Sequence, residues 1–149
     1  MIRLWLTSCL CLLALTVHAA DESLARFEHV VVDPAKTSIY VGSVTMSFTP
    51  ATRKAGVFES NYTAKVFPYF FMNEHGTLTL DAPDETLRKL ARGESVEFAG
   101  RGVSSDGKPR RFEGTAKPTD ATSGKLKVRA FVSKRIDLVF DMTYHFTPP

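Results

Sequence analysis

Two consecutive runs near the end of the chain alternate between apolar and polar side chains, and this pattern constrains the fold more than any other feature. From Lys125 to Val132 and from Ile136 to Phe146, nearly every second residue is apolar. Successive side chains of a β-strand point to opposite faces, so a period of two predicts strands with one buried and one solvated face. We expect the lysine and arginine residues of the first run to be exposed. The residues that we expect to be buried are Leu126, Val128, Ala130 and Val132.

Shorter runs of the same kind precede these two. β-Branched or alternating segments predict six earlier strands, with Thr37 to Thr49 read as one strand that bends at Gly42. The Asp106-Gly107 pair is typical of a tight hairpin, and the stretch from Asn73 to Gly76 is interpreted as a turn. The six segments are 27–32, 37–49, 58–66, 77–80, a run that starts at 94, and 112–116.

A single stretch between the fourth and fifth of these segments has the signals of a helix. Asp81 is a candidate cap, Pro83 suits a first turn, and Gly93 is typical of a helix end. The apolar stripe formed by Leu87, Leu90 and Ala91 is wide enough to seal one end or one flank of a sheet.

The whole pattern predicts an all-β fold with one inserted α-helix. About eight strands joined by hairpins form an antiparallel meander, which closes as a lipocalin-like barrel or folds as a sandwich. We predict a single domain over residues 21–149, because the chain has the length of one domain and lacks a separating linker.

The first twenty residues have the order of a secretory signal peptide. Arg3 precedes an apolar run, and the small residues Ala19 and Ala20 follow it. Thr7, Ser8 and Thr16 interrupt that run, whereas a membrane anchor needs about 20 apolar residues. A lipoprotein-like box before Cys9 has too few residues ahead of it. We therefore predict export of the protein to the periplasm or the exterior, without a transmembrane segment in its mature form.

Loss of the predicted signal peptide changes the available chemistry. Both cysteines, Cys9 and Cys11, leave with it, so the mature chain cannot form a disulfide or a cysteine metal site. The formal net charge of +3 falls to +2 without Arg3. Such a balanced charge argues against a nucleic-acid partner, which would favour a basic face with exposed aromatic residues.

No arrangement of residues predicts catalysis. The histidines outside the signal region are His29, His75 and His145, and none has a metal-ligand spacing. The sequence contains no Gly-x-Ser-x-Gly elbow and no glycine-rich phosphate loop before a helix. We therefore predict a protein that is not an enzyme and that uses no cofactor and no metal.

Aromatic residues are the strongest functional signal. The segment from Phe67 to Met72 holds so many that a strand cannot bury them on one face. We expect it to line the mouth of an apolar pocket, and we expect the small residues Gly114, Ala116 and Ala130 to leave room inside. A filled core is the alternative. The candidate ligand-binding residues are Tyr40, Phe48, Phe58, Tyr62, Phe67, Phe70, Phe71, Phe98, Phe112, Phe140 and Tyr144.

Two short motifs resemble the YceI-like family of periplasmic polyisoprenoid-binding proteins. The segment from Val32 to Ile39 is similar to that family's opening strand-turn-strand motif, and Gly56-Val57-Phe58 resembles its glycine-x-phenylalanine strand start. The resemblance implies a lipocalin-like barrel that binds a long apolar chain.

Two functional classes remain open from the sequence. One is a carrier of an apolar molecule, lipid or isoprenoid-like in character. The other is a secreted interaction module whose aromatic segment forms an exposed patch.

Overall fold

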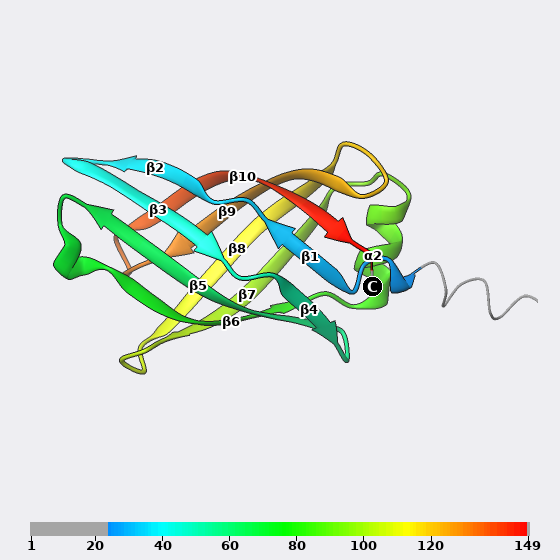
Figure 1. The fold of residues 1–149 in the computed structure, drawn as a ribbon, viewed down its shortest axis with the longest axis horizontal. Coiled ribbons are helices and arrows are strands. Elements are labelled where there is room, and N and C mark those ends of the chain that lie inside the picture. Colours follow the sequence, from blue (N-terminus) through cyan, green and yellow to red (C-terminus); the bar gives the residue numbers. More distant parts are fainter. Residues whose placement is uncertain (1–23, 149) are drawn as a thin grey trace, which may run out of the picture.

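The computed structural model describes residues 24–148, and the predicted signal peptide (1–20) lies outside the described residues. The fold is a closed, eight-stranded antiparallel β-barrel with one short α-helix between its sixth and seventh labelled strands (Figure 1). The predicted fold class is thereby confirmed, and of its two variants the barrel is the one that forms.

Ten strand segments, a short 3-10 turn and the helix make up the described chain. They are β1 (His29–Val32), β2 (Ala35–Ile39), β3 (Gly42–Phe48), β4 (Ala51–Lys54), β5 (Val57–Phe67), η1 (Phe70–Met72), β6 (Glu74–Asp81), α2 (Asp84–Ala91), β7 (Val96–Ser104), β8 (Pro109–Pro118), β9 (Ser123–Phe131) and β10 (Asp137–Thr147).

Eight positions around the barrel accommodate these ten segments, because two positions are each filled by a bent pair. β1 and β2 share one position, where they pair with β4 and β3, and those two segments in turn pair with different parts of β5. From β5 to β10 each strand pairs with the next. The ladder between β1 and β10, from His29↔Thr147 to Val32↔Tyr144, closes the ring.

The prediction of one continuous strand over residues 37–49 is wrong, because a hairpin interrupts it. β2 ends at Ile39, which pairs with Gly42 at the start of β3. Gly42 has a φ of +116°, and a Cβ there would overlap the Phe67 carbonyl oxygen, so only glycine suits this position. Tyr40 stands in the turn and is fully exposed, which corrects the expectation that it faces the interior.

The two ends of the barrel differ (Figure 1). We call the left end the hairpin end, since it carries the β2–β3, β5–β6, β7–β8 and β9–β10 connections. We call the opposite end the helix end, because α2 lies there together with the start of β1 and the end of β10.

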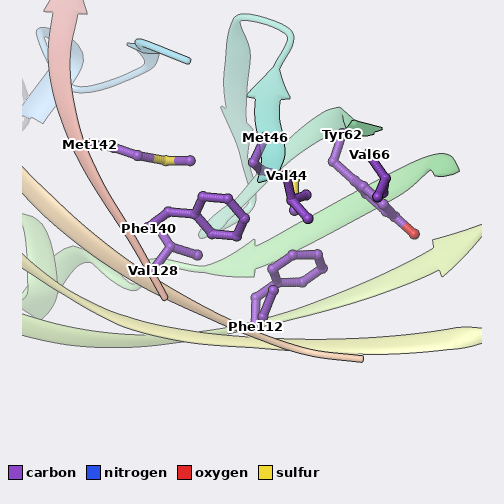
Figure 2. Close-up of a cluster of buried hydrophobic side chains, with 9 residues drawn as sticks. Val44, Met46, Tyr62, Val66, Phe112, Val128, Phe140 and Met142 are labelled. Carbon is purple, nitrogen blue, oxygen red and sulfur yellow. The ribbon is translucent and has the colours of Figure 1, made fainter. Parts of the chain in front are cut away.

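Between the ends, interdigitated side chains fill the barrel. Phe140 is completely buried, and the Tyr62 and Phe112 rings meet edge to face with centroids 5.4 Å apart. Figure 2 shows this packed core, in which rings and aliphatic side chains from several strands point toward one another. Its buried members are Val44, Met46, Tyr62, Val66, Phe112, Val128, Ala130, Phe140 and Met142.

The predicted division of β9 into a buried and an exposed face is confirmed in the interior of the strand but is wrong at its end. Val128 and Ala130 are buried, Leu126 is half-buried, and the lysines between are exposed. Val132 is 40% exposed, so the prediction that it is buried is wrong. β9 ends at Phe131, and residue 132 already belongs to the connection to β10, where alternation no longer fixes which way a side chain faces.

The predicted helix is present as α2, with Leu87 as its buried residue and Gly93 at a φ of +78° just beyond it. Asp81 is not its cap, because it is the last residue of β6, and Pro83 occupies the N-cap position. The expected turn over 73–76 is also wrong. β6 begins at Glu74, since residues 74–76 pair with residues 62–64 of β5.

Candidate functional site: an apolar cavity under the helix

A cavity of about 120 Å³ lies inside the barrel at its helix end. Nearly all side chains around it are aliphatic or aromatic, and they come from the strands on every side and from α2. The lining residues are Val30, Val32, Phe48, Thr49, Ala51, Phe58, Ser60, Leu78, Leu80, Asp81, Ala82, Thr86, Leu87, Leu90, Val96, Phe98, Phe112, Ala116, Leu126, Val128, Tyr144 and Phe146.

The helix α2 contributes one wall of this cavity. Leu87 is 1% exposed and packs with Phe27 and Phe58, while Leu90 is half-buried beside the same cluster. Because Leu87 and Leu90 lie three residues apart, they share one face of the helix. That face is the predicted apolar stripe, and it covers part of this end of the barrel.

Arg53 of β4 holds the start of the helix in place. Its Nε donates a hydrogen bond of 2.9 Å to the Ala82 carbonyl oxygen, and its Nη2 lies 2.6 Å from Asp84 Oδ1. The Arg53 guanidinium lowers the pKa of Asp84 from its usual value of 3.8. The chain segment that leads into α2 is thus fixed to the barrel wall by charge-assisted hydrogen bonds.

Five of the predicted ligand-binding residues line the cavity, and two others belong to the packed core. Tyr62 and Phe140 lie in that core, where their rings fill the barrel. The five that line the cavity are Phe48, Phe58, Phe98, Phe112 and Tyr144.

The four remaining residues stand at the hairpin end. Phe67, Phe70, Phe71 and Tyr40 are exposed there and do not line the cavity. The expectation that the aromatic segment forms the mouth of an apolar pocket is therefore wrong for this cavity. The physical reason is that the packed core lies between the hairpin end and the cavity.

Sequence reasoning missed the aliphatic part of the lining. Leu78, Leu80 and Ala82 come from β6 and the segment that follows it, and Val30 comes from β1. The sequence placed Val30, Leu78 and Leu80 in predicted strands but did not assign the faces of those strands. It could not indicate which inward residues border empty space, because that depends on how the rings of other strands fill the barrel.

The three small inward residues play different roles. Ala116 lines the cavity, whereas Ala130 lies in the packed core. At Gly114 a Cβ would lie 2.6 Å from Phe98 Cζ and would overlap the Lys127 carbonyl oxygen. The missing side chain at 114 therefore admits the Phe98 ring and a close strand, and only Ala116 fits the expectation of open space.

A polar cluster crosses the barrel interior near the hairpin end. Tyr62 donates a hydrogen bond of 2.7 Å to Glu74 Oε1, and Arg110 Nε and Nη2 reach the two Glu74 oxygens at 2.8 and 2.7 Å. The hydrogen bonds from Arg110 lower the pKa of Glu74, despite partial burial. Burial raises the pKa of Tyr62, as does the hydrogen bond to Glu74. These contacts keep Glu74 ionised and Tyr62 neutral, an arrangement that binds β5, β6 and β8 together.

The polar residues elsewhere do not form a recognisable chemical centre. Within residues 24–148, no group of three or more histidine, cysteine or acidic side chains comes close enough to hold a metal ion. His75 and His145 are exposed, and His29 Nδ1 lies 3.4 Å from Thr52 Oγ1. In the same part of the chain, no helix has the length and apolar character needed to cross a membrane.

The comparisons with known proteins leave the family open. No family model matches the chain, and no curated protein or solved structure is significantly similar to it. The resemblance to the YceI-like family stays a prediction. The functional argument accordingly depends on the cavity and the surface of this barrel.

Proposed function

We propose that the protein is an exported, non-catalytic carrier that binds an apolar molecule in the cavity beneath α2. The observation that supports this proposal is the cavity itself, about 120 Å³ of space with a nearly continuous apolar lining. Protein interiors are close-packed, and the atoms around a void lose dispersion contacts. A bound apolar molecule would restore these contacts in a cavity of this size.

The size and chemistry of the cavity define the ligand class. An engineered apolar cavity of about 150 Å³ stays dry and binds benzene, so the present cavity suits a group of similar or slightly smaller size. A compact hydrocarbon would fit whole, and an isoprenoid-like chain would place one branched end there. The lining residues Leu87, Phe112 and Tyr144 offer shape and dispersion but no charge to the ligand.

The position of the cavity beneath α2 suggests a route for entry. Leu87 and Leu90 stand between the cavity and the outer surface of α2, and Arg53 holds the segment just before the helix. A shift of α2 away from the barrel opens the cavity while the closed ring of strands stays intact. In this proposal α2 is the lid and Arg53 is its hinge contact.

Binding of a small apolar probe tests the proposal. Benzene should raise the melting temperature of the wild-type protein saturably, because a ligand that binds only the folded state stabilises it. The variant Ala116→Ile fills the cavity and should abolish this shift. The matched control Ala99→Ile makes the same change on an exposed residue of β7 and should keep it. A wild-type protein without a saturable shift, or an Ala116→Ile variant with the full shift, would overturn the proposal.

A second function, that of an interaction module, is favoured by a separate observation. The large apolar side chains that are exposed gather at the hairpin end, far from the cavity. A ligand in the cavity would leave these side chains exposed, so a separate binding partner would have to cover them.

A further inference from the structure

The exposed large apolar residues within residues 24–148 all lie in the half of the barrel toward the hairpin end. Phe71 is 85% exposed and Phe70 is 64% exposed, although burial of such a ring is worth about 1.5 to 3 kcal/mol. Scattered apolar residues on a surface are ordinary, but a group at one end marks an interaction site. The full set is Tyr40, Val41, Phe67, Phe70, Phe71, Met72, Val103, Val132, Ile136 and Val139.

Most of this set stands on the tips of three separate hairpins. Tyr40 and Val41 form the β2–β3 turn, the η1 segment carries the phenylalanines, and Val132 and Ile136 flank the β9–β10 connection. In Figure 1 the β2–β3 turn and the η1 loop project at the left end of the barrel, and the β9–β10 connection lies behind them at the same end. Separate tips of this kind suit a soft, deformable partner, whereas a folded protein would have to provide a matching hole for each tip.

The aromatic segment is built to hold its rings outward. Tyr69 is half-buried and packs against the barrel core, which anchors the segment. Phe67 and Phe70 meet edge to face at 5.9 Å, and Tyr69 and Phe71 do so at 6.0 Å. Phe67, Phe70 and Phe71 therefore meet neighbouring rings edge to face and stay exposed outside the barrel.

Basic side chains accompany the apolar tips. Lys134 and Arg135 lie between Val132 and Ile136, and Lys108 lies in the β7–β8 connection; all three are exposed. None of the three forms an ion pair within the described part of the chain. The carboxylates of the nearby strands are partly engaged, since Glu74 binds Arg110 and Asp137 lies 3.3 Å from Arg129. Asp106, which is exposed in the same connection as Lys108, offsets one of these charges. Lys134 and Arg135 still leave the hairpin end with an excess of positive charge.

We propose that the hairpin end docks on the surface of an anionic lipid bilayer. The tips of η1 and of the β2–β3 and β9–β10 hairpins enter the boundary between headgroups and acyl chains, where aromatic rings are favoured. Lys134, Arg135 and Lys108 bind the lipid phosphates. The barrel axis then points out of the membrane plane, and α2, at the opposite end, faces the aqueous side.

The charge of the end distinguishes a membrane from a second copy of this chain. Two copies joined through their hairpin ends would bring Lys134 and Arg135 toward the same residues of the partner, and like charges disfavour that contact. Anionic headgroups instead complement the basic residues and accept the apolar tips at once. This proposal uses no property of the cavity, so it stands or falls independently of the proposed carrier function.

Vesicle flotation tests the docking with the exported, processed protein. Phosphatidylcholine vesicles with and without phosphatidylglycerol distinguish anionic from neutral surfaces. We expect the wild-type protein to float with the anionic vesicles, and added salt should weaken this binding because it screens exposed charges. The double variant F70S/F71S should lower the bound fraction at least about tenfold, as expected when two buried apolar groups are lost.

Two matched controls and one direct probe sharpen this test. K134S/R135S should weaken binding to anionic vesicles, whereas R88S/K89S, which removes the same charge from the exposed face of α2, should not. A99S changes an exposed residue of the barrel wall outside this apolar set and should also leave binding unchanged. The chain has one tryptophan, Trp5, within the predicted signal peptide. F71W therefore places a reporter on the aromatic segment, and its emission should shift to the blue on vesicle addition.

The outcomes against the proposal are equally specific. Equal binding by F70S/F71S and the wild-type protein, or an F71W emission that vesicles do not change, would overturn it. A dimer in sedimentation experiments that F70S/F71S abolishes, without vesicle binding by the wild-type protein, would assign the hairpin end to a second copy of the chain.

Discussion

Two buried alanines on neighbouring strands show how the surroundings decide the effect of the same substitution. Ala116 borders the cavity, and Ala130 lies in the packed core opposite Phe112. We expect Ala116→Val to preserve or raise the free energy of unfolding, by up to about 2 kcal/mol, because it fills empty space. Ala130→Val should lower it by about 1 to 3 kcal/mol, because the core there has no room.

Urea denaturation of both variants measures these two changes. Equal losses of stability would contradict the assignment of empty space to the Ala116 side of the barrel.

The ionised state of Glu74 makes stability depend on pH. The Arg110 hydrogen bonds lower its pKa in the folded protein below the usual value of 4.5. A lowered folded-state pKa contributes stability that is fully present above the unfolded-state value, and this contribution is lost as the pH falls through the folded-state pKa. The melting temperature of Glu74→Gln should therefore lie below that of the wild-type protein at pH 7, and the gap should narrow as the pH falls from 4.5 toward 3.

A carboxylate on the barrel exterior supplies the control for this pH series. Glu97 is exposed on β7 and forms no ion pair within residues 24–148, so Glu97→Gln should change the melting temperature little at any pH. A gap for Glu74→Gln that stays constant between pH 3 and pH 7 would show that ionisation of Glu74 does not stabilise the barrel.

At the scale of single elements, the sequence predicts strands well where one face is buried and the other is wet. β9 and β10 follow their alternation because Val128 and Phe140 must face the core. The pattern fails at element ends. Apolar residues on both sides of Tyr40 conceal the β2–β3 hairpin, which depends on the backbone of Gly42 and its contact with Phe67. Such a contact comes from a distant part of the chain and leaves no local signal.

The helix α2 is stabilised by the barrel more than by its own sequence. It is eight residues long, shorter than an isolated helix needs to be stable, so Leu87 must hold it. We expect Leu87→Ala to lower the free energy of unfolding by about 2 to 5 kcal/mol, through lost burial and a larger cavity. Lys89→Ala on the exposed face should change it by about 0.5 kcal/mol or less.

Chemical denaturation compares the two variants directly. Similar small effects would mean that α2 packs loosely on the barrel, and that outcome would also weaken its proposed role as a lid.

At the scale of the whole molecule, the sequence predicted an antiparallel meander that forms a barrel or a sandwich, but not the division of its interior and ends. Alternation placed Phe48, Phe98 and Phe140 inside, yet it could not separate cavity from packed core, since a void depends on the combined volumes of side chains from all strands. The number of aromatic residues from Phe67 to Met72 indicates that a strand alone cannot bury them all. The position of this segment at the end opposite α2 follows from topology alone, because both β5 and β6 meet the hairpin end there.

The closure of the ring predicts how the chain folds. Every strand position pairs with its sequence neighbours, and only the ladder between β1 and β10 joins distant parts of the chain. Long-range pairing slows folding, because the loop must close before its contacts form. His29 lies opposite Thr147, so a short linker between the ends of β1 and β10 would turn the closing ladder into a local hairpin.

A circular permutant with that linker and new ends in the exposed turn at Asp106-Gly107 should keep the barrel. Because its β1–β10 ladder becomes local and only the β7–β8 ladder becomes distant, the order in which the ring closes should change, with β1 and β10 protected early in pulsed hydrogen exchange and β7 and β8 late. The unpermuted chain should show the reverse, with the β1–β10 ladder protected last. Identical protection orders in the two proteins would mean that the ring does not close strand by strand, and that collapse of the aromatic core around Phe112 and Phe140 precedes every ladder.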